Sequence, residues 1–330
     1  MPLAKAVPEA IRIAEPSGRG TTEHVACELC RSAEFVQVIT GVRDYITGEV
    51  FVLRHCLRCA FARTEPQPAS MAPYYPVKYR RYNPLSAALL RQFYRWRAWR
   101  WVARLGPSGV ALEIGCGDGW MLGALREQGW QVVGTERSVE SAVIPARERR
   151  VPVFVGELDA LRPAARFDAI ILFHVLEHMD DPVRVLRRCA ALLKLGGMII
   201  VAVPNWRSWQ ARCFGTAWFH LDVPRHLNHF SRRALSLTAE QAGLQIARTS
   251  SVSLEHDPYG WVQSALNRCG FPQNLLTKWL MGMSAEEQSV AGWAAMFALS
   301  VLLAIPAGVL ALASWCVGRG AVMEAWVTKS

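Results

Sequence analysis

Three glycines after a short apolar run limit what this chain can fold into more than any other feature. The run is Val110 to Ile114, and apolar residues at helical spacing resume from Trp120 to Leu125. Between them stand Gly115, Gly117 and Gly119. The pattern predicts a strand, a tight turn and a helix. Glycine tolerates positive φ and lets a ligand approach the backbone, and the first N–H groups of the helix point at that ligand. We therefore expect the turn to bind a nucleotide-like ligand.

The spacing of the glycines argues against a dinucleotide. A G-x-G-x-x-G fingerprint counted from Gly115 needs its third glycine where Trp120 stands, and an indole there would block close packing of the helix on the strand. The chain reads E-x-G-x-G-x-G instead, beginning at Glu113, and offers no lysine to grip a phosphate. A second carboxylate, Glu136, ends the next predicted strand, where it can accept hydrogen bonds from both ribose hydroxyls of a nucleoside.

Strands and helices continue to alternate along the chain. FDAIILF, residues 167–173, is an apolar strand of the kind found at the centre of a parallel sheet, and HVLEH follows it. A helix over 183–195 leads to a strand over 198–203 that ends in Pro204-Asn205. In this order, the glycine motif, the acidic end of the second strand, FDAIILFHVLEHMDDP and LLKLGGMIIVAVPN resemble the motifs of class I S-adenosylmethionine-dependent methyltransferases that act on small molecules. The resemblance covers roughly residues 105 to 253.

The resemblance implies a fold and a cofactor site. We expect an α/β, Rossmann-like class I methyltransferase sheet, mostly parallel with an antiparallel last strand. Glu157 and Leu158 follow a short third strand and are similar to the family's adenine-side loop, although Glu157 also suits an acidic surface turn. The residues expected to contact S-adenosylmethionine are Glu113, Gly115, Cys116, Gly117, Gly119, Glu136, Glu157, Leu158 and His174.

Four histidines are candidates for removing a proton from the methyl acceptor: His174, His178, His226 and His229. A neutral imidazole is the side chain most ready to accept a proton at pH 7. His226 and His229 precede a helix that Ser231 caps, on a loop expected over the carboxyl ends of the strands, where open α/β sheets bind substrate. We favour His226 as the base, with Arg225 as the partner of an anionic acceptor group. His178 suits a structural role equally well.

Two cysteine pairs near the N-terminus predict a metal site. Cys27-x-x-Cys30 and Cys56-x-x-Cys59 can close four thiolates tetrahedrally on Zn²⁺, and the alternating residues between the pairs suit a zinc ribbon. An iron site of the rubredoxin kind and four reduced core cysteines are the alternatives. The total of nine cysteines is odd, and residues 1–20 contain no apolar segment of a secretory signal, so we expect a reducing compartment.

Arginine and tryptophan are concentrated in one predicted helix. The net charge is +10, and residues 66–112 contain no acidic residue. The helix, over 85–105, suits an ordinary first helix of a catalytic domain, the surface of an anionic membrane, or RNA. Its arginines also suit a pyrophosphate group on the acceptor.

An uncharged segment near the C-terminus predicts contact with a membrane. The 31 residues from Gln288 to Gly318 carry no charge, and as one helix they extend roughly 46 Å. That length is enough for one crossing of a bilayer, whose hydrocarbon core is about 30 Å thick, but not for two crossings. Because residues 321–329 resemble the last strand of the fold, the chain must return to its starting side. We expect a re-entrant or monotopic helical hairpin bent near Pro306; a single span and a buried soluble helix pair are the alternatives.

These features divide the chain into six parts. They are a flexible lead-in over 1–23, a zinc-binding ribbon over 24–65, a basic aromatic connector and helix over 66–104, a methyltransferase core over 105–256, a membrane-associated helical insertion over 257–320, and the last strand of the core over 321–330. We expect the protein on the cytoplasmic side of the inner membrane.

The expected activity is methyl transfer to a membrane-associated acceptor. A zinc lobe before the catalytic domain is similar to the arrangement in bacterial sugar C-methyltransferases, which favours a lipid-linked sugar or glycan precursor. The motif after the central strand is also similar to ubiquinone-type O-methyltransferases, so a lipid or quinone is the alternative acceptor. A non-catalytic membrane-attached scaffold is a third reading, against which the intact glycine motif argues. We do not expect nucleic acid as the acceptor, since Pro204-Asn205 departs from the Asn-Pro-Pro-aromatic element. Oligomeric state stays open.

Overall fold

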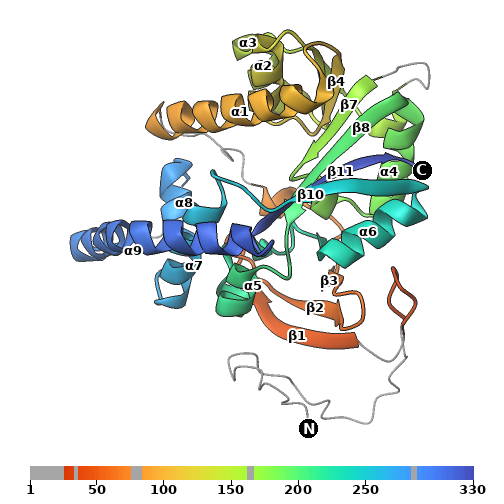
Figure 1. Ribbon diagram of the computed structural model, residues 1–330. Coiled ribbons are helices and arrows are strands. Elements are labelled where there is room, and N and C mark those ends of the chain that lie inside the picture. The colour runs from red at the N-terminus through yellow and green to blue at the C-terminus, as the bar shows by residue number, and fades with distance from the viewer. Residues whose placement is uncertain (1–25, 33–35, 76–83, 162–166, 284–287) are drawn as a thin grey trace.

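One seven-stranded sheet organises the chain in a computed structural model that describes residues 26–32, 36–75, 84–161, 167–283 and 288–330. Its strand order is β10-β11-β8-β7-β4-β5-β6 (Figure 1). The strands are β4 (Val110–Ile114), β5 (Gln131–Glu136), β6 (Val153–Val155), β7 (Phe167–Phe173), β8 (Leu193–Pro204), β10 (Leu244–Ser250) and β11 (Val322–Lys329). Neighbouring strands from β8 to β6 run parallel, and β11 pairs antiparallel with both β8 and β10. The expected Rossmann-like sheet with an antiparallel last strand is confirmed.

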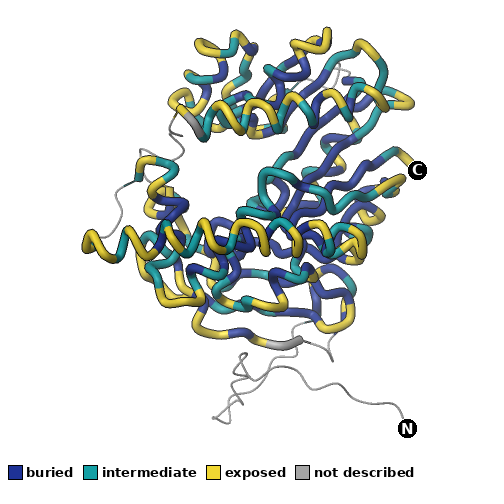
Figure 2. Tube along the Cα trace, turned by 60° about the vertical axis from the view of Figure 1, so that its left-hand side comes forward, coloured by how far each residue is buried: buried dark blue, intermediate teal, exposed yellow. Residues whose placement is uncertain are grey.

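Helices cover both faces of the sheet because its central strands are apolar on both sides. On one face α1 (Pro84–Leu105) and α2 (Trp120–Glu127) pack over Ala111 and Ile171. On the other, α4 (Pro182–Leu192) and α6 (Arg232–Gln241) pack over Leu112 and Ile170. Successive residues of each strand thus point into two separate hydrophobic cores, one on each face of the sheet. The strands form the buried centre of the molecule in Figure 2. Helix α3 (Val139–Glu148) follows β5.

A small antiparallel sheet joins the N-terminal cysteines to the rest of the molecule. It consists of β1 (Val36–Arg43), β2 (Val50–Cys56), β3 (Ala62–Glu65) and, from far along the chain, β9 (Asn228–His229). We call residues 26–32 and 36–65 the cysteine lobe. Because β3 pairs with β9, this lobe shares a sheet with the loop that precedes α6. The lead-in expected over 1–23 and part of the connector, residues 76–83, lie outside the described residues.

The insertion between β10 and β11 is helical, as expected, but its bend is not where we expected it. It contains α7 (Asp257–Arg268), α8 (Leu275–Leu280) and α9 (Val290–Cys316). The prediction of a hairpin bent near Pro306 is wrong, since α9 continues through that residue. Proline removes one helical hydrogen bond, and packing against α7 keeps the helix whole. The chain reverses before α9 instead. The indole of Trp315 at the end of α9 bonds to Asp257 at the start of α7, so α9 runs back along α7.

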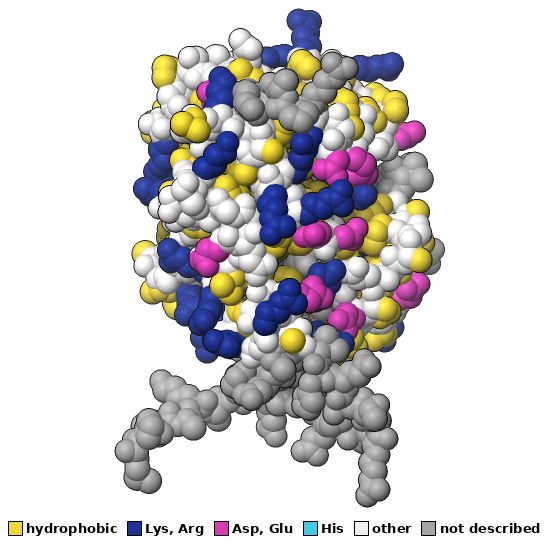
Figure 3. All heavy atoms as spheres, turned by 90° about the vertical axis from the view of Figure 1, so that its right-hand side faces the viewer, with side chains coloured by type: hydrophobic (Ala, Val, Ile, Leu, Met, Phe, Trp, Pro, Cys, Tyr) yellow, Lys and Arg dark blue, Asp and Glu magenta, His cyan; other side chains and the backbone are white. Residues whose placement is uncertain are grey.

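Helix α9 contacts the protein along one side only. Met296, Ala307 and Ala311 are buried against the insertion, whereas large apolar side chains on the other side face outward. The most exposed are Val290, Val301, Leu302 and Ile305. Within the described part of the chain, α9 is the one helix long and apolar enough to cross a membrane. The side of the molecule seen in Figure 3, turned away from α9, carries interspersed Lys, Arg, Asp and Glu.

Candidate functional site

A cavity of about 630 Å³ opens at the carboxyl ends of the central strands. Its walls come from the glycine turn after β4, the first half of α1, the loop before β9, and helices α7 and α8. Of these elements, Figure 1 shows α1 on one side and the inserted helices α7 and α8 on the other. This is the edge at which open α/β sheets bind ligands. Glu113, Gly115, Cys116 and Gly117 line the inner end, as expected from the sequence.

The glycine turn takes the backbone conformation that the motif predicts. Gly115, Gly117 and Gly119 have φ values of +62°, +52° and +70°. Gly119 does not line the cavity; it starts α2, and a Cβ there would stand 2.8 Å from the Cβ of Pro145. Glycine is therefore required at this position by packing as well as by conformation.

Two carboxylates give the inner end of the cavity its chemical character. Glu113 is buried, and its Oε2 has no hydrogen-bond partner within the described residues. Burial, together with the charge of Glu136, raises the pKa of Glu113 well above its ordinary value. Glu136 ends β5 and accepts a hydrogen bond from the amide of Gly117. A ligand that carries positive charge and hydroxyl donors would satisfy both groups, which fits S-adenosylmethionine and disfavours phosphate.

The adenine-side residues lie farther out. Glu157 and Leu158 follow β6, next to β5 in the sheet. Glu157 is exposed, and its carboxylate lies 3.4 Å from the guanidinium of Arg137. Leu158 packs against the core near α4. Neither lines the cavity, so their contact with the cofactor stays a prediction.

Three of the four candidate histidines reach the cavity. His174, His178 and His226 line it, and His174 has the unusual φ of +55° for a residue other than glycine. His174 Nδ1 lies 3.2 Å from Glu177 Oε1. His229 lies behind the wall, where its Nε2 is 2.9 Å from the hydroxyl of Thr64. Burial lowers the pKa of His229 to about 3. We therefore drop His229 from the candidate bases.

His226 and His178 present the same nitrogen for proton transfer. His226 Nδ1 donates to the carbonyl of His220 at 2.9 Å, and His178 Nδ1 donates to the carbonyl of Arg225 at 2.7 Å. A ring nitrogen that faces a carbonyl must carry the proton, so Nε2 is left as the basic atom in each neutral ring. Burial, and then the neighbouring His178, lower the pKa of His226 well below its ordinary value. His226 is thus uncharged at neutral pH.

Arg225 does not have the role expected of it. Its side chain is fully buried and bonds to Asp44 at 2.9 Å and to Asp222 at 2.7 Å. Arg97 of α1 is also engaged, since it pairs with Glu255 and Glu324 inside the protein. Asp44 lies far from Arg225 in sequence, and Glu255 and Glu324 lie far from Arg97, which is why local composition did not reveal these pairs.

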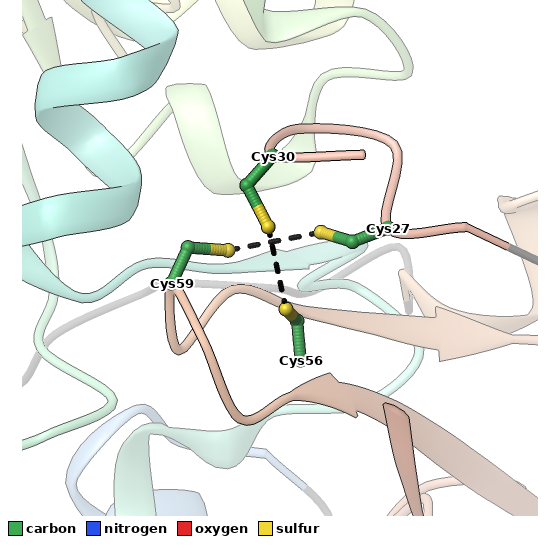
Figure 4. Close-up of side chains that lie close together, drawn as sticks. All are labelled: Cys27, Cys30, Cys56 and Cys59. Carbon is green, nitrogen blue, oxygen red and sulfur yellow. Dashed lines mark hydrogen bonds between the residues drawn. The ribbon is translucent and has the colours of Figure 1, made fainter. Parts of the chain in front are cut away.

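Two groups of side chains have the arrangement of metal ligands. The four cysteines converge from two turns (Figure 4), with Cys27 and Cys59 sulfurs 3.7 Å apart and Cys30 and Cys56 sulfurs 3.5 Å apart. The hydrogen bond from Cys59 lowers the pKa of Cys27 to about 5. The second group is Glu177, His178 and His226, whose nearest ligand atoms lie within 4.8 Å of one another.

Among the cavity residues that sequence reasoning did not single out are Tyr45, His220 and His256. The ring centroids of His174 and His256 are 4.5 Å apart, and those of His174 and His220 are 6.5 Å apart. No motif marks these positions. His220 stands in the same histidine-containing loop as His226, and that grouping was the one available signal.

Known proteins share this part of the chain. Residues 85–249 match the profile of a family described as a methyltransferase domain. A ubiquinone biosynthesis O-methyltransferase of Rhodopseudomonas palustris (strain HaA2) is 31% identical over 140 residues, which are 39% of this chain and 54% of the relative. A protein of the same name from Bradyrhizobium diazoefficiens is 30% identical over 172 residues, 49% of this chain and 66% of the relative. The chain spans about half the length of the first of these relatives.

The solved structures that the chain matches are more distant. A S-adenosylmethionine-dependent methyltransferase from Archaeoglobus fulgidus is 18% identical with a TM-score of 0.46, and the match covers 73% of this chain and 94% of that one.

Proposed function

This chain belongs to the methyltransferase-domain family, and we propose that it transfers the methyl group of S-adenosylmethionine to an oxygen of a membrane-resident lipid or quinone-type molecule. One observation carries the proposal: the cavity is walled by the same insertion that holds the exposed, uncharged helix α9. An enzyme attached in this way meets acceptors that stay in the bilayer.

The cofactor supplies a methyl group on a positively charged sulfur. Glu113 and Glu136 are the groups that would hold it. Burial deprives the Glu113 carboxylate of hydration, and a neighbouring cation compensates for that loss. With cofactor and acceptor bound, the walls of the cavity would position the acceptor oxygen relative to the methyl group, and such positioning supplies several kcal/mol through proximity alone. His226 takes the acceptor proton on Nε2, and His178 is the alternative base.

The lining of the cavity supports a neutral acceptor with an apolar portion. Its outer part is formed by Leu89, Leu90 and Phe93 of α1, and by Leu280 and Met281 at the end of α8. No lysine or arginine lines it in the part of the chain that the structure describes. A pyrophosphate group would enter without a countercharge, so a lipid-linked glycan is the less favoured acceptor. The relatives described above are named ubiquinone biosynthesis O-methyltransferases, which supports a quinol-type hydroxyl.

Helix α9 supports a membrane location. Trp279 of α8 stacks edge-on against Phe297 of α9 at 4.9 Å, and Trp293 lies 6.1 Å from the same ring. Aromatic residues at the edge of an apolar helix are typical of the membrane interface. Trp279 directly precedes the cavity residues Leu280 and Met281, so the mouth of the cavity would face the bilayer from its cytoplasmic side.

We also propose that the cysteine lobe binds Zn²⁺. A tetrahedral site with Zn–S bonds of about 2.3 Å requires sulfurs about 3.8 Å apart. The observed separations of 3.7 Å and 3.5 Å fit that requirement after a small expansion.

The experiment uses purified full-length protein, radiolabelled S-adenosylmethionine and membranes from cells that lack the gene. We expect label in a lipid-soluble product heavier than its precursor by one CH₂ unit, as measured by mass spectrometry. His226→Asn is expected to lower kcat by about 10²–10⁴-fold and to leave cofactor affinity unchanged. His55→Asn, on β2 and not among the residues that line the cavity, is the matched comparison. Label confined to RNA, protein or water-soluble sugars would contradict the proposal.

A further inference from the structure

We infer that the cysteine lobe is a working part of the acceptor site: it supplies Tyr45 as a wall in contact with the acceptor and holds the loop that carries His226. Metal in the lobe would then control acceptor binding and proton removal without controlling cofactor binding. The inference rests on the proposed function for the identity of the acceptor but not for the coupling between lobe and cavity.

Tyr45 brings the lobe into the cavity. It stands in the turn between β1 and β2, is half-buried and lines the cavity together with Asp222 and Thr277. The guanidinium of Arg225 lies 4.4 Å from the centre of its ring, and the ammonium of Lys278 lies 5.6 Å from it. Two cations from different parts of the chain thus hold one aromatic ring in place. The ring lines the cavity, whereas neither cation does.

Asp44 fixes that turn to the loop of the core. Its Oδ1 pairs with Arg225 at 2.9 Å, and both side chains are fully buried. Its Oδ2 accepts the amide of Thr47 and so closes the turn. Arg225 also donates to the carbonyl of Tyr74 at 3.0 Å. A buried ion pair of this kind is costly to break, because one charge would remain without its partner. The turn and the loop therefore move together.

Thr64 connects the lobe to the proposed base. It lies on β3, and its hydroxyl donates to the carbonyl of His226 at 2.6 Å. Its amide donates to the carbonyl of Leu227 at 3.0 Å, and β3 pairs with β9 immediately beyond. The backbone of His226 is thus held from the lobe side, while Leu227 donates to the carbonyl of Glu177 at 2.9 Å on the core side. Thr64 is a positioning residue for His226.

The cysteine cluster is continuous with these elements. Cys56 ends β2, and Cys59 stands in the turn that leads into β3. Ser231, directly after β9, donates to the carbonyl of Cys59 at 2.7 Å, and Gln241 of α6 donates to the carbonyl of Leu29 at 2.7 Å. Metal bound by the cysteines would fix the start of β3, hence Thr64 and the loop. Glu113 and Gly117 belong to β4 and its turn. The lobe meets β4 through apolar packing, since Phe61 shares a core cluster with Leu112 and Ile114, whereas hydrogen bonds tie the lobe to the loop.

Hydrogen exchange tests the coupling without any acceptor. The zinc-loaded full-length protein is compared with protein treated with a chelator. We expect faster exchange in residues 44–48 and 222–229, unchanged exchange in β4 and α2, and a dissociation constant for S-adenosylhomocysteine that stays within about twofold. Faster exchange confined to residues 26–32 and 36–65 overturns the inference. Faster exchange that includes β4, with loss of cofactor analogue binding, overturns it as well.

Two sets of variants test the residues, with dodecylcatechol in phosphatidylethanolamine–phosphatidylglycerol vesicles as the acceptor probe. Tyr45→Ala is expected to raise the acceptor KM about tenfold and to leave the cofactor dissociation constant unchanged. Thr64→Val is expected to lower kcat about 10–100-fold, since small displacements of a reacting group have that effect. Thr64→Ser, which keeps the hydroxyl, restores kcat. Val50→Ala, on the exposed side of the lobe, is the matched control.

The outcomes separate this inference from the proposed function. If the wild-type protein methylates the probe and Tyr45→Ala does so with unchanged KM, the inference fails and the proposed function stands. If Thr64→Ser is as slow as Thr64→Val, the hydroxyl does not position His226. If the wild-type protein leaves both dodecylcatechol and membrane lipids unmethylated, the proposed acceptor class fails, and the exchange measurement alone decides the coupling.

Discussion

At the scale of single residues, Glu113 sets the pH dependence of cofactor binding. Burial raises its pKa, so the free protein holds a proton there to a higher pH than an exposed glutamate would. A bound cation favours the ionised carboxylate. Affinity for S-adenosylmethionine should therefore rise as pH rises through that pKa, and Glu113→Gln should remove the dependence. Calorimetric titration across pH measures it, with the exposed Glu127→Gln of α2 as control. Parallel curves for Glu113→Gln and the wild type would contradict this role.

At the scale of elements, α9 should determine attachment to membranes. Its exposed side is apolar at Leu302 and Ile305, near the middle of the helix. A charge at the centre of a membrane helix costs about 2.5–3.5 kcal/mol, so Ile305→Lys should move the protein from the membrane fraction to the soluble fraction. Val290→Lys, at the start of the helix, should have a small effect because a lysine there can reach the interface. Vesicle flotation measures both. Equal flotation of the two variants would exclude membrane insertion of this helix.

At the scale of the whole molecule, Asp257 joins the insertion to the sheet. It accepts hydrogen bonds from Trp315 of α9 and from the backbone of Ala321 and Val322, where β11 begins. Burial raises its pKa from 3.8 to about 8. The folded chain thus holds this proton more tightly than the unfolded chain does. The stability it contributes is complete below the ordinary pKa and is lost as pH rises through about 8.

Thermal unfolding of the wild type and Asp257→Asn across pH tests that contribution. The wild type should lose stability between pH 5 and 9 more steeply than the variant, whose side chain does not titrate. An equally steep loss in both proteins would assign the pH dependence to other groups.

Much of the core follows from local patterns. The run before Gly115, the alternation of strands and helices, and the apolar strand over 167–173 predicted the sheet and the end of it that binds ligands. These features can be predicted from the sequence because each depends on residues that are close together in the chain. Side-chain periodicity, the positive φ of the glycines and the N-cap at Ser231 are all local properties. The two C-x-x-C turns predicted one four-cysteine cluster for the same reason, since each pair is local.

Contacts between distant segments could not be read in this way. Arg225 pairs with Asp44 of the lobe, β3 pairs with β9, and Tyr45 enters a cavity whose other walls come from much later in the chain. Helix α9 passes through Pro306 because α7 packs beside it. Periodicity and spacing describe which face of an element is apolar, but not which other element covers it. Those partners are chosen by packing and by the pairing of buried charges, which exist only once the whole chain has folded.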